Sequence, residues 1–309
     1  MGSIRKTHLV MGLLLAVLAL AMGWAYRPTF VELDRRWTTE PLYSHGYIIP
    51  IVALVILWTR RAMILTVETQ ASAWGIPFIL LGAAMRLGGD FFYISAPERF
   101  SLLPILIGVC LVLGGRQSLR WAWPAIAYLL FMLPLPGRFP EMLSSSLQSL
   151  ATFASTNVLQ TSGFPAQSEG NIIILSQVEL GVVEACSGIR MLVVFCAIST
   201  AVAIIIPRSL PQRILIVLNA IPLAMVCNVS RIVLTGVLYE TVSDKAAELL
   251  FHDMAGLFMC ILAAVLLWIE LQILSRLFVP VNSDRPELLD RKQKELQRPE
   301  MAASLARKG

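Results

Sequence analysis

Long apolar runs recur along most of the chain, and they constrain its fold more than any other feature. A membrane-spanning helix needs about 20 consecutive, predominantly apolar residues. Only 15% of the residues are charged, whereas a soluble globular chain carries about 25%. The sequence therefore predicts an all-α polytopic membrane protein with about eight transmembrane helices, near residues 9–26, 46–59, 73–92, 100–114, 119–136, 187–206, 213–239 and 252–278.

The connection between the fifth and sixth runs is long enough to hold structure of its own. In residues 140–161, apolar side chains recur at helical spacing among Ser, Thr and Gln, which predicts a helix lying in the membrane interface. Residues 171–183, NIIILSQVELGVV, are dense in β-branched side chains, which predicts a short β-like hairpin or extended pair. We expect one membrane domain over 1–279 and a charged, disordered cytoplasmic tail over 280–309.

The basic residues predict how the chain crosses the membrane, because Lys and Arg mark cytoplasmic connections. With a cytoplasmic N-terminus and an even number of spans, every cytoplasmic connection holds such residues: Arg5 and Lys6, Arg60 and Arg61, Arg116 and Arg120, and Arg208 and Arg213. The net charge of +5 then needs no nucleic-acid partner to explain it. Both termini are expected in the cytoplasm, and residues 181–191 at the outer face.

The stretch 181–191, GVVEACSGIRM, places a thiol, a carboxylate and a guanidinium at the mouth of the sixth span. Cys186 is expected at a helix start, where the positive end of the helix dipole favours a thiolate. Ser187 and Gly188 leave room for a substrate backbone. A lone cysteine in a membrane helix is more often a packing residue, and that role is assigned to Cys110, Cys196, Cys227 and Cys260.

Two arginines are expected near the same depth. Arg231 follows Asn228 by three residues, so both lie on one face of the seventh span, in its outer half. Such a pair can hold a carboxylate or stabilise an oxyanion, although an arginine at a span end equally often extends to the lipid head groups. Arg190 can stabilise a thiolate at Cys186, hold the loop through Glu184, or pair with another acidic residue, and the sequence leaves these roles open.

Two histidines are candidates for a base at the outer face. His252 opens the eighth span in the motif HDMAG, with Gly256 one turn later, where a helix or a substrate can approach closely. His45, in YSHGYIIP, competes with it, and either imidazole can instead be a satisfied interfacial residue. Thiol catalysis needs an imidazole to accept the thiol proton before the thiolate attacks an amide carbonyl. The sequence contains no metal-ligand spacing and no phosphate-binding loop, so neither a metal nor a cofactor is expected.

The motifs YSHGYIIP, EGNIIIL, VVEACSGIR, NVSRI and HDMAG, in this order, resemble the exosortase family, which is related to the archaeosortases. The resemblance covers about residues 40–275. It implies a bacterial inner-membrane cysteine transpeptidase. Such an enzyme recognises a PEP-CTERM sorting signal (a Pro-Glu-Pro motif, a membrane helix and a basic tail), cleaves it at the outer face, and passes the exported protein to a surface acceptor, lipid or polysaccharide. Matched by motif, Cys186 would be the nucleophile, Arg231 the arginine and His252 the imidazole of a triad.

Two other classes of protein stay open on the residues alone. A transporter or export component would use arginine and histidine in a substrate pathway, but such proteins often contain repeats and broken helices near the midplane, and no convincing repeat relates the two halves of this chain. A chemically silent scaffold for surface assembly would not need Cys, Asn, Arg and His at one depth, where polar groups are costly, although an inactive relative would have the same sequence features.

Overall fold

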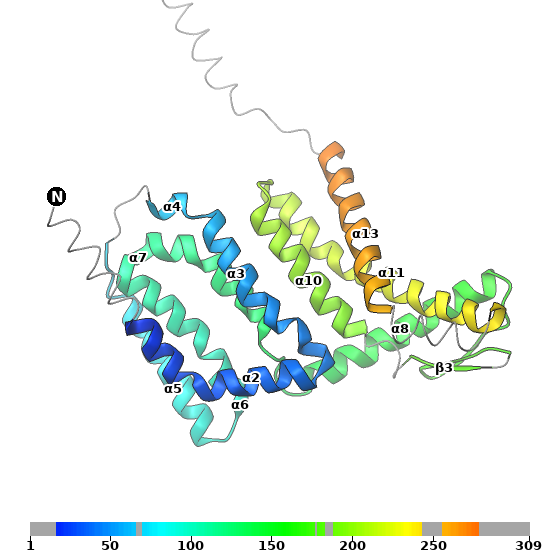
Figure 1. Cartoon of the computed structure of the whole chain (residues 1–309), viewed down its shortest axis with the longest axis horizontal. Coiled ribbons are helices and arrows are strands. Elements are labelled where there is room, and N and C mark those ends of the chain that lie inside the picture. Colours follow the sequence, from blue (N-terminus) through cyan, green and yellow to red (C-terminus); the bar gives the residue numbers. More distant parts are fainter. Residues whose placement is uncertain (1–16, 66–69, 177, 183–187, 243–254, 278–309) are drawn as a thin grey trace, which may run out of the picture. The chain divides into compact units, whose positions relative to one another are not determined.

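The computed structural model describes residues 17–65, 70–176, 178–182, 188–242 and 255–277, which are mostly helical (Figure 1). Helical segments long and apolar enough to cross a membrane occur four times in this part of the chain, at Pro41–Thr59, Ser95–Met132, Gly188–Ile205 and Leu210–Thr241. The prediction of a helical, multi-pass membrane protein is confirmed in outline. The chain divides into two units, Met1–Leu267 and Trp268–Gly309, and all contacts discussed below lie within the first.

Helices form where the second to fifth apolar runs predict them, and of the first run, 9–26, residues 9–16 lie outside the described residues. The elements of this half, with η marking a 3₁₀-helix, are α2 (Arg27–Thr39), η1 (Pro41–Tyr47), α3 (Ile48–Thr59), α4 (Ala62–Leu65), α5 (Gly75–Phe91), α6 (Ser95–Phe100), α7 (Leu102–Tyr128) and η2 (Leu129–Met132). Residues 17–25 are also helical, and a turn at Tyr26 leads from them into α2. α2 is too polar to be a span, and the Arg36–Glu32 pair, 3.2 Å apart at i,i+4 spacing, supports it as a helix.

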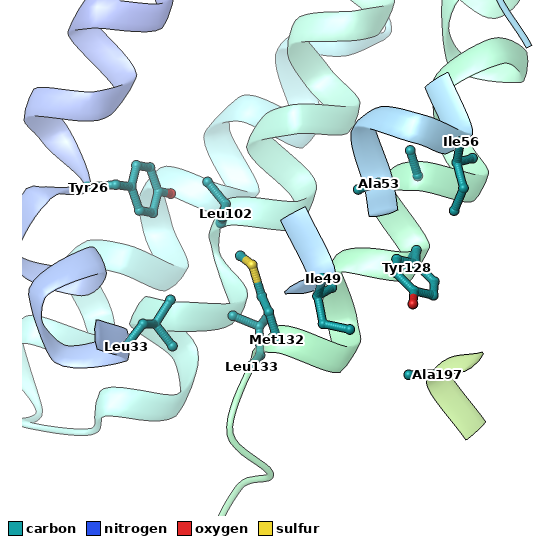
Figure 2. Packing of buried hydrophobic residues seen from close by; sticks show 11 residues of the cluster. Tyr26, Leu33, Ile49, Ala53, Ile56, Leu102, Tyr128, Met132, Leu133 and Ala197 are labelled. Carbon is teal, nitrogen blue, oxygen red and sulfur yellow. The ribbon is translucent and has the colours of Figure 1, made fainter. Parts of the chain in front are cut away.

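The apolar core of this half lies where residues of α2, α3, α7 and η2 converge (Figure 2). Its largest buried members are Tyr26, Leu33, Ile49, Ile56, Leu102, Tyr128 and Met132. Lipid tails are as apolar as these side chains, so the cluster stabilises the helices through close van der Waals packing rather than through removal from water.

α7 consists of two helical arms that meet at Gly115, which has φ 63° and ψ −155°. The sequence predicts two spans here with a connection at 115–118, and the structure replaces that connection with a sharp bend at one residue. Glycine is required because φ is positive and because a Cβ would overlap the carbonyl oxygen of Gln70. The first arm packs on α5, where Gly75 and Gly108 let the two backbones approach closely.

Side chains from α2 and from the end of α3 bind backbone carbonyls of α7 and η2. Pro124 has no N–H, so the carbonyl of Arg120 loses its usual helical donor. Arg60 Nη2 donates to that carbonyl at 3.0 Å. At the end of η2, Trp37 Nε1 donates to the carbonyl of Met132 at 3.0 Å. These contacts join segments that are far apart in the sequence.

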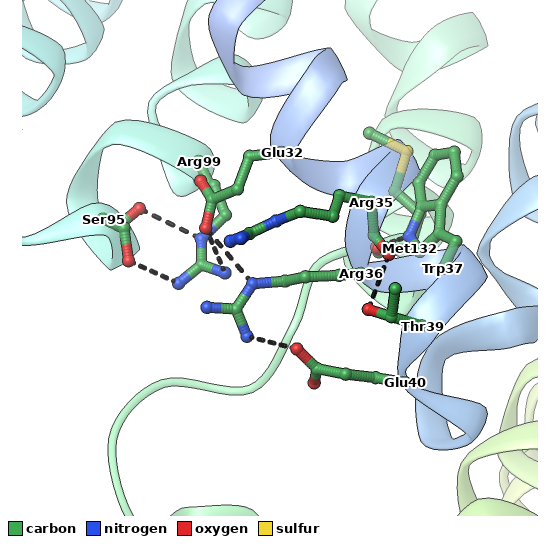
Figure 3. Close-up of polar contacts among 9 residues, drawn as sticks. All are labelled: Glu32, Arg35, Arg36, Trp37, Thr39, Glu40, Ser95, Arg99 and Met132. Atoms are coloured by element: carbon green, nitrogen blue, oxygen red, sulfur yellow. Dashed lines mark hydrogen bonds and ion pairs between the residues drawn. The ribbon is translucent and has the colours of Figure 1, made fainter.

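A buried arginine ties α6 to α2 (Figure 3). Arg99 is 4% exposed, and it donates from Nε to the Ser95 carbonyl at 3.0 Å and from Nη2 to Ser95 Oγ at 2.9 Å. Its Nη1 lies 3.5 Å from Glu32 Oε1, and Arg36 bridges Glu32 and Glu40 at 3.2 Å each. A buried guanidinium is costly unless it is paired, so this network fixes how α2 lies on α6.

The second half of the chain begins with an amphipathic helix and a small sheet. Its elements are α8 (Phe139–Thr161), β1 (Gln167–Glu169), β2 (Ile172–Ile174), β3 (Glu179–Gly181), α10 (Gly188–Ile205), α11 (Leu210–Thr241) and α13 (Ala255–Leu277). α8 is the helix predicted over 140–161. The strands are antiparallel in the order β1-β2-β3. The predicted pair corresponds to β2 and β3, and β1 is an addition, because its sequence QSE has none of the apolar residues that mark a strand.

The sheet packs against α8 and α11. Ile173 of β2 is fully buried in a cluster with Leu159 of α8 and Ile232 of α11. The backbone N–H of Ser176 donates to Glu240 Oε1 at 2.8 Å, which attaches the turn after β2 to the last turns of α11. The connection between η2 and α10 therefore contains a helix and a small sheet that pack against α11.

We expect Gly115→Ala to lower the free energy of unfolding by roughly 1–3 kcal/mol, the usual cost of holding a residue with a side chain in a sparsely populated backbone region. Thermal unfolding of the purified protein in detergent measures the change. Gly88→Ala in α5 is the matched control, because in the described part of the chain no atom outside its own helix lies within 4 Å of the added Cβ. Alanine is also the better helix former. Equal stability of the two variants would contradict the assigned bend.

Candidate functional site

The residues predicted to carry chemistry are partly outside the described residues. Those outside are Glu184, Cys186, Ser187 and His252. Those described are His45 in η1, Gly188 and Arg190 in α10, Asn228 and Arg231 in α11, and Gly256 in α13. The site is therefore built from flanking elements, since α10 begins two residues after Cys186 and α13 begins three residues after His252.

Gly188, the first residue of α10, lies against the side chain of Asn228 in α11. A Cβ added to Gly188 would lie 3.2 Å from Asn228 Nδ2, closer than ordinary van der Waals contact, so glycine lets the amide approach the α10 backbone. Asn228 is 2% exposed, and among the described residues its Oδ1 has no hydrogen-bond partner. A buried amide oxygen without a donor costs about 1–3 kcal/mol, so a donor from a bound group or from a neighbouring segment would stabilise it.

Two guanidiniums lie near the same contact. Arg190 of α10 and Arg231 of α11 are both half-buried, and they are near enough for their charges to act on each other. Arg231 lies three residues after Asn228, on the same face of α11. Among the residues that the structure describes, Arg190 Nε finds no hydrogen-bond partner. Like charges held together in apolar surroundings repel strongly, so an anion between them would be stabilising.

An apolar cluster beside these polar residues joins α10, α11 and α13. Its buried members are Leu192, Phe195, Ala220, Ala224, Cys227 and Met259. Cys227 is 0% exposed there, in the packing role expected of it. Met259 follows Gly256 by three residues and His252 by seven. The cluster therefore brings the early turns of α13 to the α10–α11 pair.

His45 binds the backbone near the end of η2. Its Nε2 donates to the carbonyl of Phe131, near the end of η2, at 3.0 Å. The ring also lines a cavity of about 510 Å³ between α3 and α10, together with Ile49 and Val194. Because Nε2 is bound to a carbonyl, His45 has a structural role that requires no catalysis.

Sequence reasoning did not assign α8 to the site. Leu147 Cβ lies 3.8 Å from the position of a Cβ on Gly188. Next to it, Gln148 Nε2 donates to Ser144 Oγ at 3.0 Å, and Asn171 Nδ2 donates to Gln148 Oε1 at 3.2 Å. The sequence signal for this role of α8 is its Ser- and Gln-rich face. The same pattern is equally typical of a helix face exposed to water.

The described residues suit an anionic or carbonyl group near the start of α10. Asn228, Arg190 and Arg231 bring an amide and two cations to neighbouring turns of α10 and α11, and such groups stabilise a carboxylate or an oxyanion. Within the described ranges, no group of three or more His, Cys, Asp or Glu side chains could hold a metal ion.

Comparison with known proteins agrees with the motifs. The family model described as transmembrane exosortase matches residues 37–269. This range includes every candidate residue above and most of the chain. No curated protein and no solved structure gives a match. Because the family model spans the ordered motifs together with the helices that connect them, the chain belongs to the transmembrane exosortase family.

Proposed function

We propose that this exosortase is a membrane cysteine transpeptidase that cleaves the C-terminal sorting signal of exported proteins and transfers them to a surface acceptor. Membership of the family implies processing of PEP-CTERM sorting signals, and exosortases are generally considered cysteine transpeptidases. The observation that carries the residue assignment is the contact of Asn228 with Gly188. It supports a site in which the face of α11 that holds Asn228 and Arg231 lies beside the segment containing Cys186.

Cys186 is the nucleophile in this proposal. His252 accepts the thiol proton, and the thiolate attacks the carbonyl carbon of the scissile amide to form a tetrahedral oxyanion. Arg231 stabilises that oxyanion. The C–N bond then breaks, the imidazolium of His252 gives its proton to the leaving amine, and the exported protein stays on Cys186 as a thioester. An acceptor nucleophile, a lipid or polysaccharide group, gives its proton to His252 and displaces the thiolate.

The other candidate residues bind or position the substrate. Arg190, near enough to Arg231 for their charges to act on each other, offers a cation to the glutamate of a Pro-Glu-Pro motif. Asn228 offers a buried amide oxygen to a donor on the nucleophile segment or on the substrate. The remaining residues support the loop that contains Cys186 or let another backbone approach closely; they are Glu184, Ser187, Gly188 and Gly256.

The chain crosses the bacterial inner membrane eight times, with both termini in the cytoplasm and the site at the outer face. Arg60, Arg120 and Arg213 belong to three connections that are predicted to be cytoplasmic. Arg60 binds the backbone of Arg120 and borders the same cavity as Arg213, which supports one cytoplasmic end for all three. The membrane domain is 1–279, and the proposed cytoplasmic tail, 280–309, lies outside the described residues.

We expect Cys186→Ala to reduce processing by several orders of magnitude, because it removes the nucleophile. Immunoblotting of a reporter that carries a PEP-CTERM signal separates full-length from cleaved protein. Cys196→Ala is the matched control, since it deletes a thiol of α10 and leaves the proposed chemistry intact. Normal processing by Cys186→Ala, or an equal loss in both variants, would count against the assigned nucleophile.

Arg231→Lys is expected to lower kcat about a hundredfold with little change in KM, because lysine keeps the charge and loses the planar donor fork that holds an oxyanion. Arg190→Lys should instead raise KM and leave kcat largely intact, as for a group that binds substrate and transition state alike. Steady-state cleavage of a signal peptide in detergent gives both constants. A change confined to KM in Arg231→Lys would assign it to substrate binding and refute its oxyanion role.

A membrane-impermeant maleimide should label Cys186 from the outer side of intact cells or spheroplasts, in a variant that keeps this cysteine alone. Labelling should stop processing, because the thiol is both exposed to the outer side and required. Labelling only after the membrane is permeabilised would reverse the proposed orientation.

A further inference from the structure

An apolar groove lies between α7, α10 and α11, and Arg60 and Arg213 complete its lining. Its volume is about 430 Å³. The apolar walls include Trp123 and Ala127 of α7, Ala203 and Ile204 of α10, and Ile214 and Leu218 of α11. Arg213 is in the first turn of α11 and Leu218 lies more than one turn further along, so the groove is cationic where α11 begins and apolar beyond it.

The two arginines are held in place by backbone carbonyls rather than by acids. Arg60 donates to the carbonyls of Arg120 and Trp121 at 3.0 and 3.2 Å. Arg213 Nε donates to the carbonyl of Arg208 at 3.0 Å. Within the described part of the chain, neither arginine forms an ion pair with a carboxylate. Carbonyl contacts orient a guanidinium and leave its full positive charge uncompensated.

The two charges also act on each other. Arg60 follows the last residue of α3, and burial lowers the pKa of its guanidinium, with a further lowering from the like charge of Arg213. Both causes disfavour the charged form, so a bound anion would relieve them. An anion that contacted both guanidiniums would form charge-assisted hydrogen bonds, the stronger kind.

Aromatic side chains indicate where this end of the groove meets the membrane. Trp123, on the groove wall, is 56% exposed. Trp58 is also largely exposed, and the Arg61 guanidinium lies 4.4 Å from the centre of its ring. Exposed tryptophans beside arginines are typical of the level of the lipid head groups. The arginines therefore lie at head-group level, and the apolar part of the groove extends toward the hydrocarbon.

We propose that this groove binds an anionic phospholipid, with its phosphate between Arg60 and Arg213 and one acyl chain along α10 and α11. Basic pockets between membrane helices on the cytoplasmic side bind such head groups in general. The cavity volume matches roughly one turn of a helix about 10 Å wide, which is too little for a docked helix and suits a chain of methylenes. A basic segment would be repelled, and the backbone of an acidic peptide would face mostly apolar walls that leave most of its hydrogen bonds unmade.

The lipid would act on the helix pair that carries the candidate site. The packed pair of α10 and α11 carries Asn228 and Arg231 toward one end and lines this groove toward the other end. A lipid that fills the groove stabilises the packing of α10 against α11, because the lipid binds only the folded protein. This inference rests on the groove and on the proposed cytoplasmic placement of its arginines, and it is independent of the proposed reaction.

Native mass spectrometry of the full-length protein in detergent tests the proposal, with dioleoyl phosphatidylglycerol and dioleoyl phosphatidylcholine as probes. The two lipids share their acyl chains and differ in net charge. We expect tighter binding of phosphatidylglycerol, and about a tenfold or greater loss of that affinity in the double variant Arg60→Gln, Arg213→Gln. Equal affinity for the two lipids in the unmodified protein would overturn the proposal.

Three further variants separate this site from general surface attraction. Arg61→Gln with Arg116→Gln removes the same charge from exposed arginines outside the groove and should keep affinity within about twofold. Arg213→Gln alone should weaken binding without removing the bonds of Arg60 to α7. Ala127→Phe fills the groove while both arginines remain, and should also weaken binding. A lipid groove would be refuted by an equal loss of affinity in the exposed pair, by unchanged affinity in Ala127→Phe, or by equally tight binding of soluble glycerol phosphate. Thermal unfolding confirms that each variant is folded.

Discussion

Backbone carbonyls that lose their helical donor need another one, because an unpaired backbone polar group in apolar surroundings is costly. This constraint organises the first half of the molecule. Pro124 frees the carbonyl of Arg120, and Arg60 binds it. The end of η2 is bound by Trp37 and His45. These donors come from α2, η1 and the residue after α3, so satisfying α7 and η2 also determines where those elements lie. Polar side chains in this half therefore serve assembly.

In the second half, two buried polar groups at the start of α10 and on the facing turn of α11 are not satisfied by the described residues. Asn228 Oδ1 and Arg190 Nε find no hydrogen-bond partner there, and Arg190 lies within electrostatic reach of Arg231. The carbonyl of Arg120 is bound by a side chain, whereas the amide oxygen of Asn228 has no donor among the described residues. The two positions therefore meet different requirements. Binding of a substrate or of the nucleophile segment would supply the missing partners.

Local patterns were sufficient to predict most of the long helices and the family, but not the polar helix α2 or the contacts between helices. Apolar runs and helical spacing predict α3, α5, α10, α11 and the amphipathic α8, and the ordered motifs predict the exosortase family, which the comparison confirms. The bend at Gly115 was missed, because it depends on the carbonyl of Gln70, which the sequence does not place nearby. The bond from His45 to Phe131 spans 86 residues and has no local signal. The triad remains a prediction, since Cys186 and His252 lie outside the described residues.

The proposed reaction depends on a thioester at Cys186, and peptide mass spectrometry after rapid quenching with acid detects this intermediate. Purified protein is mixed with a substrate that carries a PEP-CTERM signal, in the absence of an acceptor. We expect the peptide containing Cys186 to gain the mass of the substrate's N-terminal portion, and hydroxylamine to remove this added mass, as it does from a thioester. Cleavage of the substrate with an adduct on a different residue, or with no adduct on Cys186 at any time, would rule out Cys186 as the nucleophile.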